Sequence, residues 1–247
     1  MNRIRTFLAQ VAAPEAAPPW ALTTAVLAVL FAFIAMIIGS GVVYVWASTQ
    51  TFTTLAGWTL GGFLVVMFIW QTRRNDRAAL MLDPPKTPIL FIMFITFGCA
   101  LALDLVSLAI THEFQPAPEL LGLNPSALGV VEWGLAIVFM VIVQPIVEGL
   151  VFRGITLPAL RALMGAWASI LATAVLTGVF HMLVYPPNYN TTSPITPLWY
   201  GLFIPIIEAI LFSMIRNSTQ STRAAIAAQV VFGLFAVIKL LTLTGQG

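Results

Sequence analysis

Seven long apolar stretches run through this chain of 247 residues, and they constrain its fold more than any other feature. A helix needs about 20 consecutive apolar residues to cross the hydrocarbon core of a bilayer. Charged residues make up 8% of the chain, against roughly 25% in a soluble domain, so it cannot cover itself with a polar surface. We therefore predict an all-α, polytopic membrane bundle of about seven transmembrane helices. The predicted spans are residues 20–46, 52–70, 88–110, 128–160, 165–185, 198–215 and 224–243.

The chain divides into a short leader, residues 1–19, and a membrane bundle, residues 20–247. The first apolar run is longer than the h-region of a signal peptide, which spans about 7–15 residues, so we expect it to remain as an anchor. The leader either lies along the membrane surface, because several apolar side chains share one helical face, or forms a frayed tail. These side chains are Ile4, Phe7, Leu8 and Val11.

Cysteine content and net charge exclude several classes of protein. The single cysteine, Cys99, lies in an apolar run, which excludes a disulfide framework and a cysteine metal site. A formal net charge of +2 is too small to indicate a nucleic-acid partner. No cofactor is predicted. Metal binding is left open, because the chain offers only two good ligands, a Glu and a His, where a catalytic zinc usually takes three.

Basic residues fall on one side of the membrane if the helices alternate in direction, and the opposite loops contain no Lys or Arg. By the positive-inside rule, the N-terminus is predicted to be cytoplasmic and the C-terminus to lie outside. We expect a multi-pass protein of a plasma membrane or a bacterial-type inner membrane. Lys239 is the exception, and its long stem is expected to reach the membrane surface. The basic residues on the predicted cytoplasmic side are Arg3, Arg5, Arg73, Arg74, Arg77, Lys86, Arg161, Arg216 and Arg223.

Several ionisable side chains lie within or near the predicted spans, where each costs about 3 kcal/mol to insert. Glu132 is expected at the interface. Asp104 is either a proton-relay group or part of a polar contact between helices. Glu208, which follows Pro205, is expected to pair with Gln229 or a hydroxyl, or to line a water-filled break in its helix. The remaining three are Glu148, Arg153 and His181.

A depth argument brings Glu148 and His181 together. If the fourth and fifth spans turn back near Gly165, the two residues lie about 17 and 16 positions from the turn, and each climbs roughly 25 Å. Their side chains are then level. Arg153 lies inside the membrane in this arrangement, as the counter-charge of a carboxylate or a donor to carbonyls. If residues 152–160 lie in the interface instead, Arg153 is an ordinary cytoplasmic anchor.

A Glu and a His within reach of each other in a wet pocket form a general-base pair that can activate water. The alternative is a Glu–Arg–His network that only joins two helices. Residue chemistry alone leaves both interpretations open.

The motif around these residues resembles that of the CPBP intramembrane protease family, the Abi or CAAX-protease group. E-G-L-V-F-R-G begins at Glu148, and G-V-F-H places His181 33 residues later. The resemblance covers about residues 128–243. It implies that Glu148 is the water-activating carboxylate, Arg153 its structural support, and His181 a ligand of the water or oxyanion.

Four positions depart from the family pattern. Gly149 stands where the family has a second Glu, and Thr177 where it has an aromatic residue. In the last span, Gln229 replaces the family histidine and Gly233 the asparagine. Gln cannot shuttle a proton near neutral pH, so the departures predict weak or absent proteolysis. The only other histidine, His112, is expected in an outer loop.

Two functions remain from this pattern. The first is a CPBP-like protein that is weak or inactive as a protease and serves as a scaffold or accessory subunit of a membrane complex. The second is an active endopeptidase that cleaves a membrane-associated or prenylated peptide with a water activated by Glu148 and His181. A transporter with a proton path through Asp104 and Glu208 is a more distant third, because no pair of broken helices in matching halves supports it.

Overall fold

The computed structural model describes residues 1–247 except 1, 48, 122–127, 188, 190–192 and 245–247. The described residues form helices and no strand. Seven helices are long and apolar enough to cross a membrane, which confirms the predicted all-α bundle. Their bounds are Leu22–Tyr44, Gln50–Thr72, Ile89–Thr111, Val130–Met164, Ala166–Val184, Ile195–Thr219 and Thr222–Leu243.

The first three spans are single helices, α2 (Leu22–Tyr44), α3 (Gln50–Thr72) and α4 (Ile89–Thr111). A short 3-10 turn, η1 (Arg77–Leu80), precedes α4, and a second, η2 (Pro118–Leu120), follows it. The fifth and seventh spans are α8 (Ala166–Val184) and α11 (Thr222–Thr244).

The fourth and sixth spans change helical type along their length. The fourth consists of α5 (Val130–Ile137), η3 (Val138–Val143), α6 (Gln144–Glu148), η4 (Gly149–Thr156) and α7 (Leu157–Met164). The sixth consists of α9 (Ile195–Leu198), η5 (Trp199–Phe203) and α10 (Ile204–Thr219). In this pair of spans, η3, η4 and η5 are π-type segments with wider turns than an α-helix.

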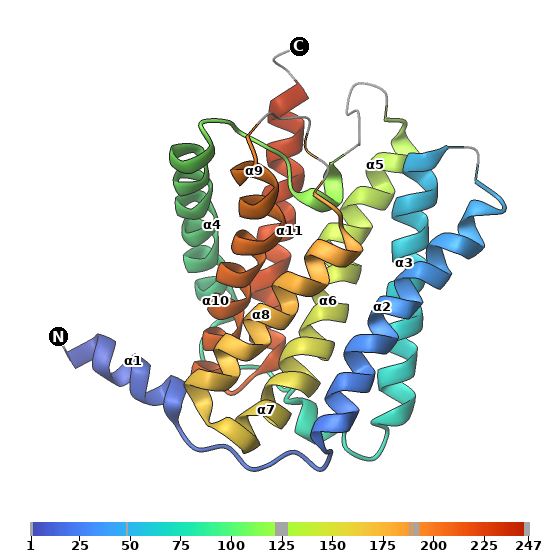
Figure 1. Ribbon diagram of the computed structural model, residues 1–247. Helices are drawn as coiled ribbons and strands as arrows, with labels where there is room; N and C mark the ends of the chain where they lie inside the picture. Colours follow the sequence, from blue (N-terminus) through green and yellow to red (C-terminus); the bar gives the residue numbers. More distant parts are fainter. Residues whose placement is uncertain (1, 48, 122–127, 188, 190–192, 245–247) are drawn as a thin grey trace.

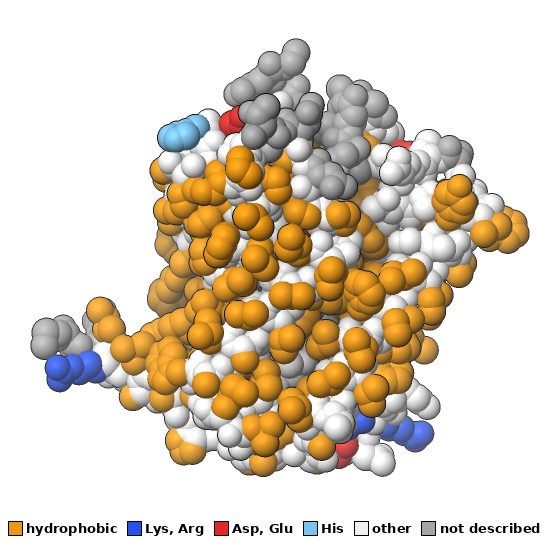
Figure 2. Space-filling view, in the orientation of Figure 1, with side chains coloured by type: hydrophobic (Ala, Val, Ile, Leu, Met, Phe, Trp, Pro, Cys, Tyr) orange, Lys and Arg blue, Asp and Glu red, His pale blue; other side chains and the backbone are white. Residues whose placement is uncertain are grey.

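In Figure 1, α2 and α3 form a hairpin at one edge of the bundle, α4 lies at the other edge against α11, and the fourth span runs between them. The two termini lie at opposite ends of the bundle. A wide apolar surface covers the face shown in Figure 2, with Lys and Arg visible at the lower edge, on the side of the N-terminus. This distribution agrees with the predicted orientation, which stays a prediction.

Small residues let α2 and α3 approach closely. A Cβ built on Gly39 would lie 2.2 Å from the carbonyl oxygen of Gly57, and one on Gly61 would lie 2.5 Å from that of Ala35. At these positions the backbones of α2 and α3 lie too close together for any residue larger than glycine. The G-x-x-x-G spacing at Gly57 and Gly61 is thus a packing surface between helices.

The leader forms a helix, α1 (Asn2–Ala12), that packs against α10. Val11 is fully buried, whereas Ile4, Phe7 and Leu8 are exposed together on the remaining surface of α1. The expectation of a frayed tail is therefore wrong for this helix. Three of the four apolar residues that the sequence assigns to membrane contact are thus exposed, whereas Val11 packs inside the protein.

The segment after α1 is held by two buried arginines. The guanidinium of Arg216 donates to both carboxylate oxygens of Glu15, and Arg161 Nη1 lies 3.6 Å from the same carboxylate. Arg161 also donates to the carbonyl oxygens of Val11, at 3.3 Å, and of Ala13. Both arginines, which the sequence assigns to the cytoplasmic side, thus lie in α7 and α10 and bind the leader.

Replacing Glu15 with alanine is expected to lower the free energy of unfolding by about 2 kcal/mol, because two buried guanidinium groups lose their carboxylate partner. Release of the leader should also make cleavage by trypsin after Arg5 faster, because the helix around it loses its contacts with α10. Thermal unfolding and timed proteolysis would measure both effects. Asp83→Ala, which removes an exposed carboxylate, is the control and should change neither.

Candidate functional site

Each wide helical segment ends two residues before a proline. The segments η3, η4 and η5 end at Val143, Thr156 and Phe203, and the prolines are Pro145, Pro158 and Pro205. Proline lacks a backbone N–H and its ring clashes with the carbonyl four residues earlier, so the preceding turn opens. The segment η5 lies directly before Pro205, where an opened helix is one of the two alternatives that the sequence leaves for Glu208.

The opened turns have polar partners. Thr156 donates its hydroxyl to the carbonyl oxygen of Val151 at 2.8 Å, and the indole N–H of Trp20 donates to that of Ile155 at 3.1 Å. Between η3 and η4 lies α6, a helix of only five residues that ends at Glu148. The position of Glu148 is thus fixed by a wide turn on either side.

Glu148 and His181 are in contact, as the depth argument predicts. His181 Nε2 lies 3.0 Å from Glu148 Oε1 and 3.1 Å from Oε2. Gln144 Nε2 donates to Oε1 at 3.0 Å, and Gln229 Nε2 donates to Oε2 at 2.7 Å. Glu148 is 1% exposed, so four nitrogen–oxygen contacts surround a buried carboxylate.

Arg153 is buried beside this group but makes no direct ion pair with Glu148 among the residues that the structure describes. Its guanidinium lies 5.3 Å from the ring centre of Phe212 and 5.8 Å from that of Phe152. Its Nε and Nη1 find no hydrogen-bond partner in the described part of the chain. The expected contact between Arg153 and a carboxylate is therefore absent, and its charge acts on Glu148 and Glu208 only at longer range.

Glu119 is the site residue that the sequence analysis missed. It lies in η2, in the loop that was expected to be exposed, yet its side chain is 5% exposed. Gln144 Nε2 donates to Glu119 Oε1 at 2.9 Å, and His181 Nδ1 lies 3.1 Å from the same oxygen, off the line of a hydrogen bond. One amide nitrogen thus bridges Glu119 and Glu148. The only signal in the sequence was an acidic residue between Pro118 and two leucines.

Other predicted residues take different places. Gln229 pairs with Glu148, so the expected pairing of Glu208 with Gln229 is wrong. Asp104 forms an ion pair with Lys239, which confirms a polar contact between helices, whereas the expectation that Lys239 reaches the surface is wrong. Lys239 instead stays near the rings of Phe114 and Tyr200. His112 is exposed, as expected, at the end of α4.

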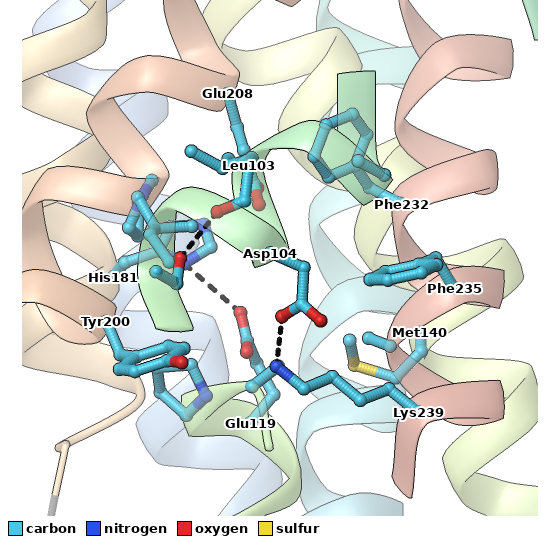
Figure 3. Close-up of a pocket in the computed structure, with 18 of the residues that line it drawn as sticks. Leu103, Asp104, Glu119, Met140, His181, Tyr200, Glu208, Phe232, Phe235 and Lys239 are labelled. Carbon is cyan, nitrogen blue, oxygen red and sulfur yellow. Dashed lines mark hydrogen bonds and ion pairs between the residues drawn. The ribbon is translucent and has the colours of Figure 1, made fainter. Parts of the chain in front are cut away.

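A cavity of about 100 Å³ lies beside the Glu148–His181 pair. That volume has room for several water molecules, since one needs about 10–15 Å³. Side chains of α4, α10, α11 and the loop before α5 line it. Figure 3 shows Glu119, His181 and Glu208 around it, with the Asp104–Lys239 pair at its side. Gln144 and Gln229 also line the cavity, but Glu148 does not.

Two of the four positions that depart from the family pattern, Gly149 and Gly233, are tightly packed. A Cβ on Gly149 would lie 2.3 Å from Cγ1 of Ile226, and one on Gly233 would lie 1.9 Å from the carbonyl oxygen of Met140. Neither position has space for a glutamate or an asparagine. In the described part of the chain, no group of three or more His, Cys, Asp or Glu residues is arranged to hold a metal ion.

Residues 131–236 match a family model described as type II CAAX prenyl endopeptidase Rce1-like. The predicted CPBP-family resemblance is confirmed over this segment. The segment contains Glu148, Arg153, His181 and Gln229, and it excludes Glu119. Comparison with curated proteins and with solved structures gives no match. The chain is thus a multi-pass membrane protein in which residues 131–236 are CAAX-protease-like.

Proposed function

We propose that this protein is an intramembrane endopeptidase that hydrolyses a membrane-associated peptide, with a prenylated peptide as the substrate class that the CPBP family suggests. The observation that carries the proposal is the contact between Glu148 and His181 at the wall of a cavity with room for water. A dry Glu148–Arg153 bridge would have favoured a structural role, and no such bridge joins these residues.

Hydrolysis of a peptide bond requires a base for the water and a donor for the oxyanion. His181 lines the cavity and is held by Glu148, so it can contact a water molecule there. Gln229 Nε2 carries two N–H bonds and uses one of them on Glu148, which leaves one for an oxyanion. Because an amide cannot carry a proton to the leaving amine, we expect a slower reaction than a second histidine at residue 229 would give.

Replacing Glu148 with glutamine is expected to reduce kcat by a factor on the order of 100 or more, because His181 loses the charge that orients it. The probe is an internally quenched peptide with a farnesylated cysteine near its C-terminus, incubated with full-length protein in lipid nanodiscs. Glu132→Gln, at the outer end of the same span, is the control and should cleave at the wild-type rate. Equal rates for wild type and Glu148→Gln would refute the proposal.

A second candidate function is a non-catalytic accessory subunit of a membrane complex. The packed positions at Gly149 and Gly233 favour it, because they leave no space for further polar groups at the site. Helix α4 is mostly exposed on the outside of the bundle, with apolar side chains such as Leu90, Phe94 and Leu105, and it offers area for a protein neighbour. Purification in mild detergent followed by native mass spectrometry tests this function, and a chain that always migrates alone contradicts it.

A further inference from the structure

The two carboxylates at His181 differ in their access to the cavity. Each oxygen of Glu148 already accepts an amide N–H and lies near His181 Nε2, and Glu148 is absent from the cavity wall. A water molecule in the cavity therefore finds no open oxygen on Glu148. Glu119 and Glu208 do line the cavity, and only Glu119 also contacts His181.

The free acceptor of Glu119 is Oε2. Its Oε1 holds Gln144 Nε2 and His181 Nδ1, whereas no described residue donates to Oε2. A carboxylate oxygen on the wall of a cavity that fits water is positioned to accept a proton from that water. Glu208 lacks a comparable contact, since it forms neither a hydrogen bond nor an ion pair with any residue in the described ranges.

The loop that carries Glu119 is fixed at several points. Pro118 and Leu120, on either side of Glu119, are buried. The phenol of Tyr189 donates to the carbonyl oxygen of Pro116 at 2.9 Å, and that of Tyr200 donates to the carbonyl oxygen of Glu113 at 3.3 Å. Burial raises the pKa of Tyr189 well above its ordinary value, so this phenol keeps its proton and remains a donor. The loop that carries Glu119 is therefore held by its buried flanking residues and by two neighbouring phenols.

We propose that Glu119 is the general base of this site, with His181 and Gln144 as the groups that hold it and Glu148 as the carboxylate that positions these two side chains. Its Oε2 takes a proton from a cavity water while the water oxygen forms a bond to the carbonyl carbon of the peptide. The carbon–nitrogen bond then breaks, and the proton passes from Glu119 to the leaving amine nitrogen. This role rests on the proposed peptidase function and assigns it to a residue outside the segment that matches the family.

Glu119→Gln is expected to lower kcat by a factor on the order of 100 or more, with KM changed less than about threefold. Glu119→Ala should lose the same activity and leave space in the cavity for a small carboxylate. Added formate should then restore the rate of Glu119→Ala by about tenfold or more and leave Glu119→Gln unchanged. A purely structural role for Glu119 predicts no rescue by formate. The matched control is Glu113→Gln, which neutralises an exposed carboxylate of the same loop.

The outcomes separate the two proposals. Wild-type protein that cleaves the farnesylated probe, together with a Glu119→Gln variant that cleaves it equally fast, would overturn the role of Glu119 and leave the peptidase function standing. Wild-type protein that cleaves nothing would overturn both. The Glu119→Gln variant must also elute as a monodisperse protein and keep the wild-type melting temperature. If it does not, Glu119→Asp takes its place. The kcat of Glu119→Asp is expected to lie between those of wild type and Glu119→Ala.

Discussion

Replacing Gly233 with alanine is expected to destabilise the protein by about 3 kcal/mol or more, at the upper end of the cost of overpacking a core. The added Cβ would lie 1.9 Å from the carbonyl oxygen of Met140, which is backbone and cannot rotate away. The contact would force α11 away from η3, and both elements border the cavity. A fall of the melting temperature in detergent by several degrees would measure the effect.

The matched control for Gly233→Ala is Gly98→Ala in α4. A Cβ on Gly98 meets nothing within 4 Å, and alanine favours a helix more than glycine does. The Gly98 variant should therefore melt at or slightly above the wild-type temperature. If the Gly233→Ala variant had the same melting temperature as Gly98→Ala, α11 could not approach Met140 as closely as the structure shows.

Replacing Glu148 with alanine is expected to cost about 3–5 kcal/mol, the range seen when one partner of a buried ion pair is removed. Gln144, Gln229 and His181 would each lose their acceptor on Glu148, which is itself only 1% exposed. Glu148→Gln should cost less, because it keeps the volume and one acceptor oxygen. Thermal or denaturant unfolding in the same detergent would rank the variants.

Glu132→Ala is the reference for that series, since Glu132 lies in the first turn of α5 and is only partly buried. Its free energy of unfolding should stay within about 0.5 kcal/mol of wild type. A Glu148→Ala variant as stable as Glu132→Ala would show that the polar cluster contributes little to the fold.

Much of the fold was predictable because two quantities are nearly constant in membranes. Hydrocarbon thickness fixes the length of a span, and a helix rises 1.5 Å per residue. The seven spans and the shared depth of Glu148 and His181 follow from these quantities alone. Neither quantity says which spans are neighbours, so the pairing of Asp104 with Lys239 could not be read from the sequence.

The part of the site that the sequence did not predict comes from a loop. Glu119 reaches His181 because Pro118 and Leu120 are buried around it, and a loop of this kind has no periodic pattern that reveals its path. Arg153 illustrates a different difficulty. Its depth was predicted, but the wide turns of η4 place its guanidinium beside aromatic rings instead of beside Glu148.

The eight residues of η4 also have a consequence for deletions in this segment. A π-type turn holds about one residue more than an α-helical turn, so removing one residue, such as Val151, would let the segment return to ordinary α-helical hydrogen bonding. Helix α7 would then keep nearly its present direction, and Arg161 would still face the leader. The wide turn beside Glu148 would be lost, so such a deletion should disturb the site more than the binding of the leader. Relatives that are one residue shorter here are expected to have an ordinary α-helical turn at this place.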